Sequence, residues 1–142
     1  MIKRASCLQA PVAVLTARHV SRATRILPTA ALARLVIHGP TEEFLRLCRS
    51  LDADGMRHPV LTFRCPWLEF VRYRRLHDKH RGDPEPERFE PGDYVFAVKR
   101  GNQRVAYALE RGYRYIAADV YETEHEIELA HVRHDEIDAE VR

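Results

Sequence analysis

The fold is decided by the stretch Tyr94-Val-Phe-Ala-Val-Lys-Arg-Gly-Asn-Gln-Arg-Val-Ala-Tyr-Ala-Leu-Glu-Arg-Gly112. Its apolar run 94–98 is short and rich in β-branched and aromatic residues, which predicts a buried strand. Apolar residues then recur at helical spacing from Val105, and a glycine such as Gly112 typically ends a helix. We therefore expect a strand, a tight turn at Gly101-Asn102 and a helix.

A helix that begins directly after such a turn is a candidate phosphate site. Its first backbone N–H groups have no partner within the helix, and the helix dipole places partial positive charge beside them. Arg104 adds a full positive charge in the first turn. The alternative is an ordinary connection between a strand and a helix, with an arginine on the surface.

Length and composition indicate one globular domain. The chain has 142 residues, of which 45% are hydrophobic and 31% charged, which argues against disordered and membrane-spanning classes. No apolar run approaches the roughly 20 residues that cross a bilayer. The three cysteines are odd in number and widely spaced, so reduced thiols are expected. These features predict a cytoplasmic protein with no membrane partner.

Charge is distributed unevenly along the chain. Residues 1–34 carry a net charge of +6 without an acidic side chain, whereas residues 119–142 carry −7. Such segregation indicates a basic N-terminal arm, residues 1–21, that meets phosphates or the acidic end of another subunit in a homo-oligomer. Two solvated faces that neutralise each other within one fold are the alternative.

The remaining periodicities predict an α+β domain over residues 22–142. We expect a helix at 41–52, N-capped by Thr41 and ended by Gly55. Residues 64–92 form an insert that contains a basic helix at 66–79 and a proline-rich loop. The other expected elements are strands at 23–27, 60–63 and 115–121, one or two helical turns within 29–35, and a last helix that starts at Thr123.

Taken in order, several of these pieces resemble the ParB/sulfiredoxin superfamily over roughly residues 23–134. The helix 41–52 is followed by Gly55 and His58-Pro59-Val60, and then by the turn Gly101-Asn-Gln-Arg104. That turn is similar to the Gly-Glu-Arg-Arg type turn of partition proteins. It is most similar to the Gly-Asn-x-Arg turn of stand-alone ParB-like proteins, which are common in bacteriophage genomes.

The resemblance implies a compact α+β domain, with a small mixed sheet flanked by helices, that binds a nucleoside triphosphate such as ATP or CTP, with magnesium as a further candidate. It implies that the backbone of Gly101, Asn102 and Gln103 and the side chain of Arg104 hold the phosphates, and that His58 and Pro59 lie beside the base. The implied activities are those of a nucleoside triphosphatase or a phosphotransferase of a phage or mobile element.

Two departures from the superfamily pattern limit the chemistry. Sulfiredoxins carry a cysteine in the phosphate turn, where this chain has Asn102-Gln103, so sulfiredoxin activity is not expected. Partition proteins carry a Glu-Asn pair late in the last helix, where this chain has Arg133-His134. A carboxylate that could act as a base or a magnesium ligand is needed for phosphoryl transfer, and the candidates are Glu42, Glu43 and Asp119.

A DNA-associated accessory protein and a virion or assembly component are the other functions considered. For DNA, the phosphate contacts would come from the basic arm and from the basic helix, with aromatic side chains close by. No metal site is predicted, because the histidines at 125, 131 and 134 lack the spacing of a closed zinc site. The candidate DNA contacts in the basic helix are Arg72, Arg74, Arg75 and Lys79.

Overall fold

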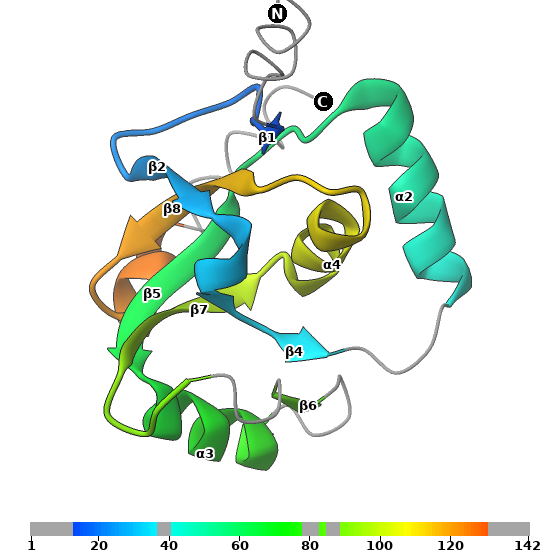
Figure 1. Cartoon of the computed structure of the whole chain (residues 1–142). Helices are drawn as coiled ribbons and strands as arrows, with labels where there is room; N and C mark the ends of the chain where they lie inside the picture. Colours follow the sequence, from blue (N-terminus) through cyan, green and yellow to red (C-terminus); the bar gives the residue numbers. More distant parts are fainter. Residues whose placement is uncertain (1–12, 37–40, 78–82, 85–88, 131–142) are drawn as a thin grey trace, which may run out of the picture.

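The structure, a computed structural model, describes residues 13–36, 41–77, 83–84 and 89–130, and the side chains of all of these except 73–77 and 83–84. Figure 1 shows a central sheet with helices on both sides. The sheet has six strands of mixed direction, which confirms the predicted α+β class.

The sheet is built around the long strands β8, β5 and β7. Its order is β1-β8-β5-β7-β3, and β2 pairs with β8. β8 runs parallel to β5, and β7 runs antiparallel to β5. The strands are β1 (Val14–Leu15), β2 (Thr24–Pro28), β3 (Leu32–Ala33), β5 (Val60–Pro66), β7 (Tyr94–Arg100) and β8 (Tyr115–Tyr121).

The helices lie on both faces of this sheet because its strands bury side chains on both faces. Along β5, Val60 packs in a core with α2 and α4, whereas Leu61 and Phe63 pack in a second core with α3 and Ile127. A strand whose successive side chains are buried on opposite faces needs cover on each side. The helices are α2 (Glu42–Asp54), α3 (Trp67–His77), α4 (Asn102–Glu110) and residues 124–130.

The predicted elements agree with the structure in most places. The helix at 41–52, the strand at 115–121 and the turn before α4 are all present. Thr41 caps α2 by accepting a hydrogen bond from the backbone N–H of Phe44, and Gly55 ends the helix with a φ of 75°. The last helix begins after Thr123, whose Oγ1 accepts a hydrogen bond from the backbone N–H of Glu126.

Three predicted segments differ from the structure. The expected helical turns at 29–35 are a short 3-10 turn, η1 (Thr29–Ala31), after which the chain enters β3 to pair with β7. The strand expected at 60–63 is longer, because β5 continues to Pro66. The expected loop contains β6 (Asp83–Pro84), which pairs with β4 (Leu35–Val36). These short strands are stabilised by distant partners, which periodicity does not reveal.

A polar cluster joins α2 to α4. The Asp52 carboxylate accepts hydrogen bonds from the Tyr107 hydroxyl at 2.7 Å and from the Arg111 guanidinium at 3.0 and 3.2 Å. The Arg111 guanidinium also lies over the Tyr107 ring, 5.3 Å from its centroid. Because these contacts come from both helices, they fix the spacing between α2 and α4.

This cluster predicts a pH-dependent contribution to stability. The hydrogen bonds from Arg111 and Tyr107 hold the pKa of the Asp52 carboxyl below its ordinary value. The cluster therefore stabilises the fold above the unfolded-state pKa, and this contribution is lost as the pH falls through the lower folded-state pKa. We expect Asp52→Asn to lower the melting temperature by a few degrees at neutral pH and to match the wild type in strong acid.

Thermal unfolding followed by circular dichroism between neutral and strongly acidic pH measures this difference. Asp54→Asn is the matched control, because Asp54 is exposed in the same helix and should change the melting temperature little. A difference between Asp52→Asn and the wild type that stays constant over the whole pH range would show that the carboxylate does not contribute in this way.

Candidate anion-binding groove

The antiparallel pairing of β5 and β7 brings two distant parts of the chain together. Leu61, near the start of β5, pairs with Arg100 at the end of β7. The residues that precede β5 therefore lie beside the residues that follow β7. In this way the pair His58-Pro59 is placed next to the turn Gly101-Asn-Gln-Arg104, although more than 40 residues separate them in the sequence.

Gly101 sits where no other residue fits well. Its φ of 110° lies in the left-handed region, which side chains with a Cβ rarely adopt. A Cβ added to Gly101 would lie 2.5 Å from Cγ1 of Val60 and 3.0 Å from Nη2 of Arg104. The glycine thus allows α4 to start directly against β5, with the Arg104 guanidinium beside the first turn.

Arg104 is held in a fixed position at the start of α4. Its Nη1 donates a hydrogen bond to the backbone carbonyl oxygen of His58. Burial, and secondarily the charge of Arg100, lower the pKa of the Arg104 guanidinium to about 10, while Asp119 acts in the opposite direction. The guanidinium is therefore still a cation at neutral pH, and it is positioned before any ligand arrives.

Two cavities meet at Arg104. The first has a volume of about 470 Å³ and is lined by His58, Pro59 and the end of α2; we call it the His58 cavity. The second has a volume of about 580 Å³ and is lined by the turn 101–104 and the start of α2; we call it the Gln103 cavity. Both are lined by Leu47, Arg100 and Arg104, and together they form what we call the Arg104 groove.

The Arg104 groove is strongly cationic. Its basic lining residues outnumber its two acidic ones, Glu43 and Asp54. Within the described part of the chain, neither Arg100 nor Arg104 forms an ion pair with a carboxylate. Cations that face a cavity without an acidic partner favour an anionic ligand. The basic residues are Arg18, Arg57, Lys99, Arg100 and Arg104.

The groove includes basic residues that the sequence analysis did not select. Lys99 and Arg100 directly precede the turn, so their position next to Gly101 was a usable signal. Lys99 also pairs with Glu124, at 2.9 Å. Arg57 directly precedes His58, so it offered the same kind of signal. Arg18 was expected only as part of the basic arm 1–21, and both residues line the His58 cavity.

A loop from the predicted N-terminal arm covers one side of the groove. The backbone N–H of Arg18 donates to the carbonyl oxygen of Met56, and the His19 ring lies 5.1 Å from the His58 ring between centroids. Asp119 anchors the far end of this loop by accepting hydrogen bonds from the hydroxyl groups of Ser21 and Thr24. Asp119 is buried in this role, with 1% of its surface exposed.

The other predicted site residues do not all line the Arg104 groove. The Asn102 side-chain oxygen accepts a hydrogen bond from the backbone N–H of Leu35 at 2.8 Å, so it holds the start of β4. Asn102 also lines the Gln103 cavity. Of the two glutamates at the start of α2, Glu43 lines the Gln103 cavity and Glu42 does not. Asp119 is not among the groove residues.

The predicted DNA contacts and the histidines fall partly outside the described residues. Arg72 is exposed on α3, whereas the side chains of Arg74 and Arg75 and the whole of Lys79 lie outside the described part. Of the three histidines, His125 is exposed and lies 3.9 Å from Glu128, and the other two lie beyond residue 130. In the described ranges no three His, Cys, Asp or Glu side chains are grouped to hold a metal ion.

Neither the lengths of the helices nor the comparisons with known proteins assign a function to this chain. Over the residues that are described, no helix has the length and apolar character that crossing a membrane requires. No protein-family model, curated protein or solved structure matches this chain. A function must therefore be argued from the groove itself and from the ordered motifs around it.

Proposed function

We propose that this chain is a ParB/sulfiredoxin-like domain that binds a nucleoside triphosphate in the Arg104 groove. The observation that carries the proposal is the position of Arg104. Its guanidinium is fixed by the His58 carbonyl oxygen, has no carboxylate partner among the described residues, and lies where two cavities meet at the start of α4. Phosphate groups suit such a site because backbone N–H groups and a guanidinium can bind them together.

The two cavities suit the two ends of a nucleotide. The Gln103 cavity combines the first turn of α4 with Lys99 and Arg100, which suits the phosphates. No described side chain caps the helix there, so its first N–H groups are available. The His58 cavity combines an imidazole with the buried Pro59 and with apolar side chains of α2, which suits a flat base.

Glu43 is the candidate for a role in phosphoryl transfer. It lines the Gln103 cavity, where the proposal places the phosphates. Magnesium fits this arrangement, because Mg²⁺ is commonly held by one or two carboxylates together with phosphate oxygens. Bound there, the ion would neutralise phosphate charge, while Glu43 would either hold the ion or orient a nucleophile. Hydrolysis and transfer to a second substrate are the two reactions consistent with this arrangement.

Isothermal titration calorimetry with ATP, CTP, GTP and their diphosphates, with and without magnesium, tests the binding proposal. We expect one site per chain and a preference for triphosphates over diphosphates, because the groove carries several cations. Affinity should fall as salt is added. If none of these nucleotides binds at millimolar concentration, the proposal is wrong.

Replacing Glu43 tests its role in turnover. We expect Glu43→Gln to keep nucleotide affinity within a few-fold and to lower the rate of phosphate release by about 10-fold or more, because the amide is a weaker base and metal ligand. Glu42→Gln is the matched control, since the adjacent side chain does not line the cavity. Equal effects of the two substitutions on phosphate release would remove Glu43 from the mechanism.

A further inference from the structure

α2 runs along the whole length of the Arg104 groove. Glu43, near the start of the helix, lines the Gln103 cavity alone, Leu47 lines both cavities, and Asp54, at the end of the helix, lines the His58 cavity alone. Arg104 lies where the two cavities meet. A nucleotide whose phosphates lie at Arg104 and whose base lies beside His58 is therefore expected to bring the outer edge of its base to Asp54.

The end of α2 supplies hydrogen-bond acceptors to the His58 cavity. The residues of this end that line the cavity are Ser50, Leu51, Asp54 and Gly55. Gly55 ends the helix, and its backbone N–H donates to the carbonyl oxygen of Leu51 at 2.9 Å. The carbonyl groups that follow Leu51 in the last turn have no donor within the helix. A ligand with N–H groups therefore meets acceptors at this end of the cavity.

Negative charge is concentrated at the same end of α2. The helix dipole places partial negative charge there, and the last turn of the helix contains no basic residue. Asp54 adds a full negative charge. Arg18 and Arg57 line the same cavity, yet among the residues that the structure describes no cation forms an ion pair with the Asp54 carboxylate. Asp54 is therefore available as an acceptor for a ligand.

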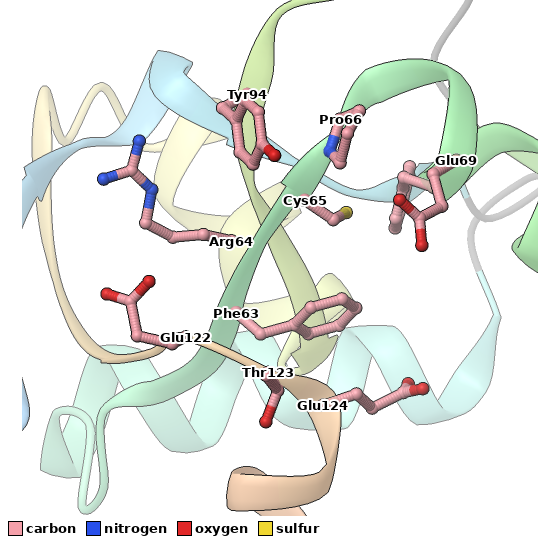
Figure 2. Close-up of a pocket in the computed structure, with 10 residues that line it drawn as sticks. Phe63, Arg64, Cys65, Pro66, Glu69, Tyr94, Glu122, Thr123 and Glu124 are labelled. Atoms are coloured by element: carbon pink, nitrogen blue, oxygen red, sulfur yellow. The ribbon is translucent and has the colours of Figure 1, made fainter.

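A larger cavity near the other end of β5, with a volume of about 760 Å³, does not offer a comparable nucleotide site. Of the described residues that line it, three are glutamates and one, Arg64, is basic. Figure 2 shows the lining side chains on both sides of β5, with Arg64 and Glu122 on one side and Phe63, Cys65 and Glu69 on the other. These side chains do not surround one ligand, and their acidic groups disfavour a triphosphate.

We infer that Asp54 is a specificity-determining residue of the Arg104 groove and that it selects a nucleotide whose base carries an exocyclic amino group, as cytosine, adenine and guanine do. The amino group donates a hydrogen bond to the Asp54 carboxylate, an acceptor that suits it. A base with an oxygen atom in that place, such as uracil, brings two acceptors together instead. The inference rests on the proposed nucleotide site and adds the chemistry by which that site recognises the base.

Isothermal titration calorimetry of the full chain with matched nucleotides tests this inference. UTP carries an oxygen atom in place of the amino group of CTP, and inosine triphosphate (ITP) lacks the amino groups of ATP and of GTP. We expect the preferred amino-bearing nucleotide to bind at least tenfold more tightly than its matched analogue, because the analogue loses a charge-assisted hydrogen bond. In amide NMR, the resonances of Asp54 and Gly55 should shift when the preferred nucleotide binds.

Two variants show whether Asp54 causes this preference. Asp54→Asn should reduce it to about threefold or less, because an amide can rotate to serve an oxygen atom as well as an amino group. Glu110→Gln removes an exposed carboxylate outside the groove and should keep the full preference. Equal binding of the matched nucleotides by the wild type, or an undiminished preference in Asp54→Asn, would overturn the inference and leave the nucleotide site standing. Absence of binding by every nucleotide would overturn both.

Discussion

Replacing Arg104 by alanine is expected to lower nucleotide affinity by about 100-fold or more. A guanidinium that forms two charge-assisted hydrogen bonds with phosphate contributes about 1.5–3 kcal/mol for each bond. Arg104 is already held by the His58 carbonyl oxygen, so binding does not have to order its side chain. Calorimetry with the preferred triphosphate measures the loss.

Two further variants make this result specific. Arg104→Lys keeps the charge but not the planar fork, so we expect it to recover only part of the affinity. Arg114→Ala removes an exposed arginine outside the groove and should bind as the wild type does. Circular dichroism must show that Arg104→Ala remains folded. Wild-type affinity in a folded Arg104→Ala variant would mean that the nucleotide does not bind at this arginine.

Replacing Gly101 by alanine is expected to destabilise the fold by about 3 kcal/mol or more. Part of the loss comes from forcing an L side chain into the left-handed region, at about 1–2 kcal/mol. The rest comes from the new Cβ, which would lie 2.5 Å from Val60 Cγ1, since overpacking a core costs about 1–3 kcal/mol. Urea unfolding followed by circular dichroism measures the change.

Gly55→Ala separates these two contributions. Gly55 also has a positive φ, of 75°, but nothing lies within 4 Å of the position that its Cβ would take. Gly55→Ala should therefore lower the free energy of unfolding only by the conformational cost, about 1–2 kcal/mol. Compared with V60A alone, the pair G101A/V60A should lose less than Gly101→Ala loses in the wild type, because it removes the Cγ1 contact at 2.5 Å and keeps only the Cβ contact at 2.9 Å. Equal losses for Gly55→Ala and Gly101→Ala would show that close packing against Val60 does not matter.

The sequence predicted the elements whose signals are local. The strand and helix on either side of Gly101 differ in period, and α2 carries both of its end signals, at Thr41 and Gly55. The structure contains each of them. Of the one or two helical turns expected within 29–35, only the 3-10 turn η1 is present, because the chain then enters β3. β3 has two residues and pairs with β7, so no periodicity in the sequence marks it.

The sequence predicted separate motifs of the groove but not how the fold brings them together. The turn 101–104 and the pair His58-Pro59 were both selected from the sequence, and the pairing of β5 with β7 places them side by side. Arg57 was not selected although it directly precedes His58, and Arg18 was expected only as part of the basic arm, whose place beside the His58 cavity depends on the fold. The choice between Glu42 and Glu43 likewise needed the orientation of α2.

A crystal structure with the preferred triphosphate tests the central claim most directly. We predict phosphate oxygens at about 3 Å from the backbone nitrogens of the turn 102–103 and from the Arg104 guanidinium, with the base beside His58 and Pro59. A nucleotide bound elsewhere on the chain, with the Arg104 groove filled by solvent alone, would contradict the account.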